Sequence, residues 1–222
     1  MTIIDLSLLV DDDTQLPIPV RKKLSFDTVT KSPGYWQSTW LSMSAHTATH
    51  VDAPLHVCEN GDRIGDIPLD RLVGEAVVLD LSGKGEEDAR IARQDLSVFA
   101  GDVREGDVVL IRTDWGLKRW NAPDLSFWLK SPVLTVDGAE CLVEMRPSAV
   151  GFDCFQEYGA RNVDFVPDDF AVHKVLLGAG VLIYEGLTNL HLLTRKRVKV
   201  IAAPLRLRCT EAAPARIFAI ED

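Results

Sequence analysis

The sequence predicts a single α/β domain that spans residues 1–222, and three observations support this prediction. The chain has an ordinary globular composition, with 46% hydrophobic and 26% charged residues, and is long enough to bury a core without disulfide bonds. Several short runs are apolar throughout, which is typical of strands buried on both faces. These runs alternate with segments that carry helix boundary signals, and strands interleaved with helices indicate the α/β class.

The strand-like runs consist mostly of aliphatic and β-branched residues. We expect strands at residues 35–43, 76–81, 108–113, 149–153, 181–185, 198–207 and 217–220. The stretch before the first of them, residues 11–34, contains Pro17, Pro19 and Pro33, so we expect an arm or a long loop there.

Three segments fit helices best, at residues 90–99, 137–145 and 168–177. The third has the clearest ends, because Pro167 precedes it, two acidic residues occupy its first turn and Gly178 follows it. Proline and acidic side chains favour a helix N-terminus, and glycine favours a C-terminus.

Composition argues against nucleic acid and membrane as partners. The 33 acidic residues outnumber the 24 basic ones and give a net charge of −9, whereas nucleic-acid binding depends on neutralising phosphates. The longest uncharged apolar stretch, residues 175–184, has 10 residues, and a membrane span needs about 20. The four cysteines form no CxxC pair and no signal peptide is visible, so we expect a cytoplasmic protein with reduced thiols.

Three of the five histidines, His46, His50 and His56, fall within 11 residues. An even distribution would place about 0.25 histidines in such a window. Asp52 lies in the same segment. Imidazole and carboxylate are the usual ligands of zinc and manganese, so the segment is a candidate metal site. The alternative is a polar surface strand that carries histidines by chance.

This segment should be extended, because β-branched residues alternate along it and Pro54 would disrupt a helix. In a strand, His46, Ala48, His50 and Asp52 share one face. His50 and Asp52 would then stand about 6.6 Å apart along the strand, but His46 and His50 would stand about 13 Å apart. We therefore expect a bend near Ala48 that brings His46 closer.

The histidine segment resembles the signature of the metal-dependent cyclase family, which includes bacterial kynurenine formamidases and isatin hydrolases. It reads His46-x-Ala48-Thr49-His50-x-Asp52-x-Pro54-x-His56. The family's usual form is H-x-G-T-H-x-D-x-P-x-H, so an alanine replaces the common glycine. The resemblance covers most of the chain through Arg112-Thr113-x-Trp115, Val150-Gly151-x-Asp153, His173-x-x-Leu176-Leu177 and Glu185-x-Leu187-x-Asn189-Leu190.

The resemblance implies a metal site and a proton-transfer residue. His46, His50 and Asp52 would bind a divalent metal, zinc or manganese, and His56 would donate and accept the proton. In formamidase-like members, a second metal would be held by Asp52, His173 and Glu185, so one or two metals per chain are expected.

The resemblance also implies a mixed or barrel-like sheet flanked by helices, of the swivelling β/β/α type, and a homodimer or homotetramer. The implied reaction is metal-assisted hydrolysis of an amide or lactam C–N bond in a small aromatic substrate. One alternative is lactone or ester hydrolysis, or cyclisation, by the same family. Another is a non-catalytic protein that binds a metal or a ligand, although such a protein would not need a proton donor such as His56.

The residues themselves support the second ligand pair. The expected helix at 168–177 carries His173, and the apolar run at 181–184 delivers Glu185 to its end. A carboxylate that ends a buried strand is costly unless it is paired or binds a metal. The alternatives are an ion pair between Glu185 and an arginine, and a core position for His173.

Tryptophans are candidate walls of a substrate pocket. Trp115, Trp120 and Trp128 lie between an expected strand and Pro132, and Trp40 precedes the histidine segment. A flat aromatic substrate would pack against such side chains, so Trp115 and Trp40 are candidate substrate contacts. The alternative is that these tryptophans fill the core.

Overall fold

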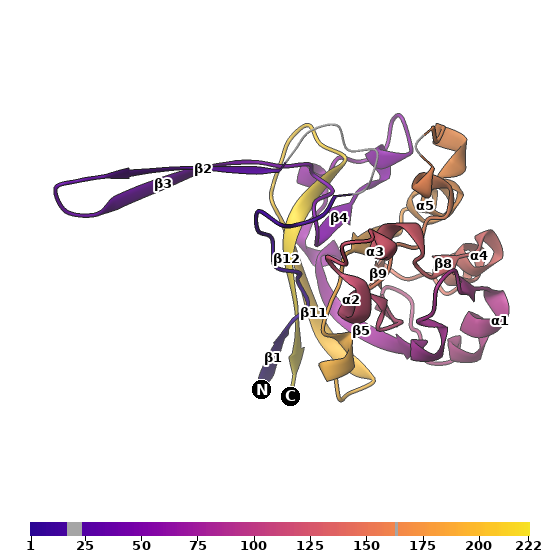
Figure 1. Ribbon diagram of the computed structural model, residues 1–222. Coiled ribbons are helices and arrows are strands. Elements are labelled where there is room, and N and C mark those ends of the chain that lie inside the picture. Colours follow the sequence, from indigo (N-terminus) through magenta and orange to yellow (C-terminus); the bar gives the residue numbers. More distant parts are fainter. Residues whose placement is uncertain (17–23, 163) are drawn as a thin grey trace.

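A closed ring of strands forms the centre of the molecule in the computed structural model, which describes residues 1–16, 24–162 and 164–222 (Figure 1). The strand order is β1-β12-β11-β5-β7-β9-β10-β4, and a further pairing of β4 with β12 closes seven of these strands into the ring. β1 pairs with the other end of β12. The strands are β1 (Thr2–Asp5), β4 (His50–Asp52), β5 (Val73–Asp80), β7 (Val108–Arg112), β9 (Ala149–Phe152), β10 (Leu182–Glu185), β11 (Arg197–Pro204) and β12 (Ala212–Glu221).

Parallel pairing in the ring requires crossover connections, and these connections carry the helices. Strands β5, β7, β9 and β10 run parallel to their neighbours in this order, and the remaining pairs of the ring are antiparallel. The helices are α1 (Arg93–Leu96), α2 (Trp115–Arg119), α3 (Ser126–Leu129), α4 (Val136–Glu144) and α5 (Ala171–Gly178). None of the described helices has both the length and the apolar character needed to cross a membrane.

Alternate residues of the parallel strands face two separate cores. On β9, Val150 belongs to a cluster that contains Leu142 of α4 and Leu176 of α5, so this face of the ring lies under helices. The preceding Ala149 belongs to a second cluster, with Ala76 of β5, that fills the inside of the ring. Successive side chains of a strand point to opposite faces, which explains this division.

The predicted fold class is confirmed, because the chain forms an α/β structure with a mixed, barrel-like sheet. The expected strands at 76–81, 108–113, 149–153, 181–185, 198–207 and 217–220 correspond to β5, β7, β9, β10, β11 and β12. The expected helix at 137–145 corresponds to α4. The helix expected at 168–177 begins as a 3-10 turn at Pro167–Asp169 and continues as α5.

The prediction of a helix at residues 90–99 is wrong for its first turn. Residues Arg90–Ile91 form β6, which pairs with β8 (Val133–Leu134), and the side chain of Ile91 is fully buried. Helix α1 begins only after Ala92, whose backbone N–H donates to the side chain of Asp95. Burial and strand pairing of Ile91 therefore override the helical pattern.

A projecting hairpin confirms the arm alternative for the end of the segment 11–34, and its second strand corresponds to the strand expected at residues 35–43. Strand β2 (Ser25–Lys31) pairs with β3 (Trp36–Ser42), and the hairpin extends away from the ring (Figure 1). Residues 17–23 of the expected loop lie outside the described residues. The β-branched residues 28–30 favour a strand, and Gly34, with a φ of +84°, suits the connecting turn. This hairpin, residues 25–42, is called the arm below.

Candidate metal centre

The expected bend at Ala48 is confirmed. Its φ of +54° lies in the left-handed region, so the chain turns there before β4 begins at His50. The turn folds His46 back toward β4, and His46 Nδ1 lies 3.3 Å from His50 Nε2. Because glycine adopts this backbone conformation without strain, the structure also explains the glycine in the usual form of the motif.

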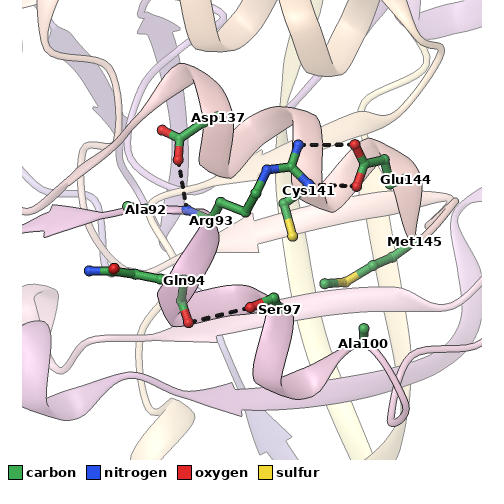
Figure 2. A pocket seen from close by; sticks show the side chains of 9 residues that line it. All are labelled: Ala92, Arg93, Gln94, Ser97, Ala100, Asp137, Cys141, Glu144 and Met145. Carbon is green, nitrogen blue, oxygen red and sulfur yellow. Dashed lines mark hydrogen bonds and ion pairs between the residues drawn. The ribbon is translucent and has the colours of Figure 1, made fainter.

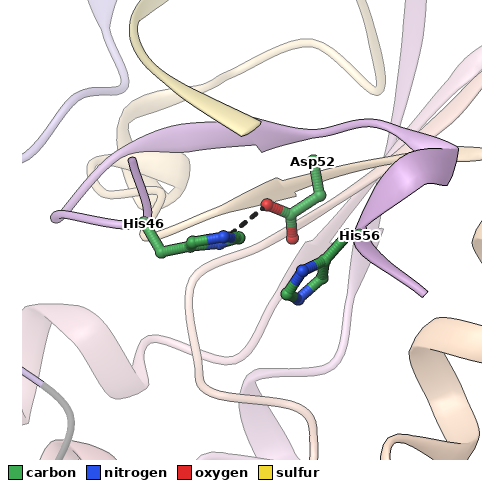
Figure 3. Close-up of side chains that lie close together, drawn as sticks. All are labelled: His46, Asp52 and His56. Carbon is green, nitrogen blue, oxygen red and sulfur yellow. Dashed lines mark ion pairs between the residues drawn. The ribbon is translucent and has the colours of Figure 1, made fainter. Parts of the chain in front are cut away.

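Asp52 lies close to both of these rings. Its Oδ1 is 3.1 Å from His46 Nδ1 and 3.3 Å from His50 Nε2. The side chain is fully buried, and neither carboxylate oxygen has a hydrogen bond of ordinary geometry to a described residue. Figure 3 shows Asp52 with His46 on one side and His56 on the other. A buried carboxylate in this state is costly unless a cation compensates its charge.

His173 of α5 and Glu185 of β10 complete the cluster. Glu185 Oε1 lies 3.1 Å from His173 Nε2, and Glu185 Oε2 lies 3.4 Å from His50 Nε2. Asp52 Oδ2 lies 3.7 Å from His173 Nε2. Glu185 therefore reaches two histidines and Asp52 reaches three. The structure brings the side chains predicted as metal ligands, including His46, into one cluster under α5.

His46, His50 and His173 each have one ring nitrogen engaged on the side away from the cluster. The contacts, all 2.9 Å long, are His46 Nε2 to Glu211 Oε1, His50 Nδ1 to the carbonyl oxygen of Ala48, and His173 Nδ1 to Glu157 Oε2. When these nitrogens donate their protons outward, the opposite nitrogens present lone pairs to the cluster. Metal-binding histidines are typically oriented in this way.

Opposite charges hold the cluster together. Burial alone would raise the pKa of Asp52, but the neighbouring His50 and His46 hold it well below its ordinary value. Burial likewise opposes ionisation of Glu185, yet the hydrogen bond from His173 and the nearby positive charges lower its pKa. Burial would lower the pKa of His46 and His173, but their carboxylate partners raise both to about 10. A metal ion must therefore displace protons from this site.

His56 stands at the edge of the cluster, at the end of the 3-10 turn Pro54–His56. Its ring centroid lies 4.5 Å from that of His46 and 5.4 Å from that of His173. Burial, helped by the charges of these two rings, lowers the pKa of His56 to about 4 in the metal-free protein, so the ring is neutral at pH 7. Its nearest nitrogen is also within 4.8 Å of ligand atoms of His46 and Asp52, so distance alone permits His56 to bind an ion.

The residues present fit a divalent cation. Asp52 and Glu185 make ion pairs only with histidines among the described residues, so no described arginine neutralises Glu185. Inward-facing imidazole nitrogens and carboxylate oxygens are the donors that zinc and manganese accept. The buried oxygens of Asp52 without hydrogen bonds are the atoms that such an ion would satisfy.

An aromatic pocket of about 240 Å³ opens onto the cluster. His46, His56, His173 and Glu185 form its polar lining. Its apolar walls are Trp128, Phe155, Phe165 and Phe170, which meet edge to face in the pairs Trp128–Phe155 and Phe165–Phe170. The pocket therefore joins a flat apolar space to the candidate metal ligands.

The two tryptophans singled out from the sequence lie elsewhere. Trp115 is 1% exposed and packs in the core, where its indole N–H donates to the carbonyl oxygen of Phe127. Trp40 lies on the arm and is 77% exposed. Neither lines the aromatic pocket.

A larger groove, of about 730 Å³, lies between α1 and α4 (Figure 2). Its side chains include Arg93, Asp137 and Glu144, and Arg93 pairs with Glu144 at 2.6 Å. The residues that line it include no histidine, and Arg93 is already paired with Glu144. The clustered side chains thus line the smaller pocket and not this groove.

Several residues of the site escaped sequence reasoning. Glu157 and Glu211 act through tertiary contacts with His173 and His46, and no local spacing identifies them. The one available signal is that residues 153–157 follow the carboxyl end of a parallel strand, where sites of α/β proteins form. Phe170 sits in the short break between the 3-10 turn and α5, which the helical pattern concealed.

A closed mixed barrel with a buried imidazole–carboxylate cluster under an aromatic pocket is the architecture of a metal-dependent hydrolase. The model of the Cyclase family matches residues 4–157, and this chain belongs to that family.

Similar proteins agree with this assignment. The chain is 34% identical over 178 residues to a kynurenine formamidase of Salinibacter ruber, covering 79% of this chain and 76% of the relative. Isatin hydrolase A from Labrenzia aggregata, bound to benzyl benzoate, has a TM-score of 0.79 at 27% identity, with 98% and 93% of the two chains covered. A structure described as a potential metal-dependent hydrolase with cyclase activity has a TM-score of 0.74 at 29% identity, with 100% and 99% covered.

Proposed function

We propose that this protein is a metal-dependent hydrolase that cleaves an amide or lactam C–N bond of a small aromatic substrate. The observation that carries the proposal is the placement of His46, His50, Asp52, His173 and Glu185 at the base of an aromatic pocket. Relatives named as kynurenine formamidase and isatin hydrolase support the same class of reaction.

A divalent ion held by these residues would lower the pKa of a bound water toward about 7 and polarise the substrate carbonyl. His56 faces the same pocket and is placed to take a proton from the attacking water. As the water oxygen bonds to the carbonyl carbon and the C–N bond breaks, His56 returns this proton to the leaving nitrogen. Phe170 packs edge-on against His56, with ring centroids 5.8 Å apart, and limits the positions of its ring.

The pocket walls support an aromatic substrate. Trp128, Phe155, Phe165 and Phe170 offer ring faces and edges around a space of about 240 Å³. Aromatic rings pack against such surfaces with a preference for offset or edge-to-face contacts. A substrate ring held there would place its amide or lactam group toward the histidines, since these form the polar side of the same pocket.

For the metal we propose zinc or manganese, with two ions per chain. The mixed nitrogen and oxygen donors suit both metals. Two ions are favoured because Asp52 reaches His46 and His50 with one oxygen and His173 with the other. Elemental analysis of the purified protein should give about two equivalents per chain, and a single equivalent would reject the two-ion arrangement.

We also propose a homodimer or homotetramer. A two-stranded hairpin is at best marginally stable alone in water, and the arm exposes Trp36, Trp40 and Leu41. A second copy would cover these side chains. Light scattering should give a multiple of 24.6 kDa, and Trp40→Ser should shift the protein toward monomer. Monomeric wild-type protein would contradict this proposal.

The free thiols of the four cysteines support the cytoplasm as the compartment of the protein.

The function is tested by assaying zinc- and manganese-loaded protein on N-formylkynurenine, isatin and an aryl ester. Hydrolysis of the amide or the lactam is the expected result. Turnover of the ester or of lactones alone would favour the alternative reaction of the family. Full metal loading with no turnover on a broad panel of amides, lactams and esters would favour a non-catalytic binding protein.

A further inference from the structure

Two consecutive residues, Gln156 and Glu157, each contact a different ligand in the second half of the cluster. The Nε2 of Gln156 donates to Glu185 Oε1 at 2.6 Å. Glu157 Oε2 accepts from His173 Nδ1 at 2.9 Å. Both residues follow β9, the strand that pairs in parallel with β10, which carries Glu185. One short segment therefore touches both members of the pair His173–Glu185.

The Glu157 carboxylate is held in place independently of the His173 ring. The same Oε2 accepts the backbone N–H groups of Val172 and His173, at 3.0 and 3.1 Å. The residue is 2% exposed. Its position relative to the first turn of α5 is therefore set by the backbone, and the His173 ring must adapt to it.

This arrangement selects one tautomer of the neutral His173 ring. A carboxylate can only accept, so Nδ1 must keep its proton and Nε2 must present its lone pair toward Glu185. The opposite tautomer would place a lone pair against the Glu157 carboxylate. A carboxylate that accepts from a ligating imidazole also makes the imidazole a stronger ligand.

We propose that Gln156 and Glu157 are positioning residues that prearrange Glu185 and His173 to bind the second ion. This inference rests on the two-ion arrangement proposed above. Gln156 restrains the rotation of the Glu185 carboxylate through its Oε1, while Glu157 fixes the ring and the tautomer of His173. Neither residue touches the substrate or moves a proton in the reaction.

Glu157 is more deeply buried than Glu211, the corresponding carboxylate partner of His46. The Glu211 side chain is 36% exposed, so solvent weakens its charge. The Glu157 side chain is buried, and its interaction with His173 is stronger in the less polar interior. Loss of the Glu157 charge should therefore weaken binding of the second ion and leave the first ion bound.

The test compares metal-free wild-type protein with Glu157→Gln by calorimetric titration with zinc. Glutamine keeps the size and one acceptor oxygen for the backbone N–H groups but removes the charge. We expect the second equivalent to bind about 10- to 100-fold more weakly and the first to bind within about twofold of wild type. Gln156→Met, which keeps a similar volume and removes the N–H donor, should also weaken only the second equivalent. Glu144→Gln, which removes an exposed carboxylate on α4, is the matched control.

A second readout follows the His173 ring directly. In zinc-loaded protein labelled with ¹⁵N-histidine, the Nδ1–H of His173 should exchange slowly with water in wild type and faster in Glu157→Gln. This measurement, together with Gln156→Met, keeps the inference testable if Glu157→Gln fails to fold.

The outcomes distinguish this inference from the proposed function. Two equivalents with wild-type affinities in both variants, even with lowered thermal stability, would make the two residues merely structural and overturn the inference alone. A single equivalent in wild type would overturn the two-ion proposal and this inference together.

Discussion

Glu185 lies directly opposite His50 in the antiparallel pair of β10 and β4, and its Oε2 is 3.4 Å from His50 Nε2. Residues opposite one another in an antiparallel pair project from the same face of the sheet. The register of this pair therefore brings together two candidate ligands that are far apart in the chain. The same face carries Asp52 and is covered by α5, which supplies His173.

Asp52→Ala should abolish metal retention together with activity. The Asp52 carboxylate reaches His46 and His50 with Oδ1 and His173 with Oδ2, so its removal affects both proposed ion positions. The expected result is less than about 10% of the wild-type metal content after dialysis, given that loss of a direct ligand costs more than the roughly 10- to 100-fold of an outer partner. Elemental analysis provides the measurement, with circular dichroism as the check on folding. Full metal retention would exclude Asp52 as a ligand.

His56→Ala should retain the metal but have a much lower kcat. A positioned acid–base group contributes roughly 10²- to 10⁴-fold to kcat, and we expect a loss of that size with little change in metal content. Steady-state kinetics and elemental analysis of the same preparation measure both quantities. If the metal is lost and added metal restores the rate, His56 is a ligand and its assignment as the proton-transfer residue is wrong.

Gly186→Ala should destabilise the protein and distort the bend at Ala48. Gly186 has a φ of +64°, and an added Cβ would stand 2.4 Å from the carbonyl oxygen of Ala48. The left-handed backbone and the overlap together should cost about 2–5 kcal/mol of unfolding free energy. Gly178→Ala, at the end of α5 with open space around it, is the control and should change stability by about 1 kcal/mol or less. Equal unfolding midpoints in urea for both variants would contradict the expectation.

Local signals were sufficient to predict half of the site. The spacing of His46, His50 and Asp52 requires a bend in an otherwise extended segment, and the structure places that bend at Ala48. The bend follows from the rise per residue of a strand and the limited reach of two imidazole side chains, so it can be inferred without the rest of the chain. The apolar runs that became β9 and β10 were recognisable for the same reason, since burial on both faces leaves a clear pattern.

Tertiary contacts determine the rest, and the sequence contains no comparable signal for them. Trp115 and Trp40 are both tryptophans beside expected strands, yet one fills the core and the other projects on the arm. The difference in burial between these two tryptophans depends on which elements pack against them. Local sequence patterns do not identify the partners Glu157 and Glu211 either, because each contacts its histidine only in the folded chain.

Phe170→Ala should impair binding of aromatic substrates more than it impairs folding. Phe170 contacts His56 and His173 and forms part of the pocket wall. Loss of one such contact should raise KM roughly 5- to 20-fold, since an aromatic pair contributes about 0.5–1.5 kcal/mol beyond the apolar area it buries. Leu69→Ala, which is 78% exposed and lies outside the aromatic pocket, should leave the KM within about twofold and serves as the control. An unchanged KM in Phe170→Ala would place the substrate elsewhere.

Metal uptake should release protons, and the affinity for metal should fall as the pH is lowered. A metal ion binds the neutral imidazole, but the pKa values of His46 and His173 are about 10 in the metal-free protein, so both rings are protonated at pH 7.5. Each ion that binds must therefore displace about one proton, and its apparent affinity should drop about tenfold for each pH unit below the pKa of the ring.

Calorimetric titrations at pH 7.5 in two buffers with different ionisation enthalpies count the released protons. We expect about one proton with each of two equivalents, and His173→Ala should lose the second equivalent and its proton together. His191→Ala is the matched control, because His191 lies in the turn Leu190–Leu192, outside the cluster. Heats that do not depend on the buffer would mean that the imidazoles are already neutral. In that case the carboxylates do not hold protons on these rings, and the electrostatic account of the cluster fails.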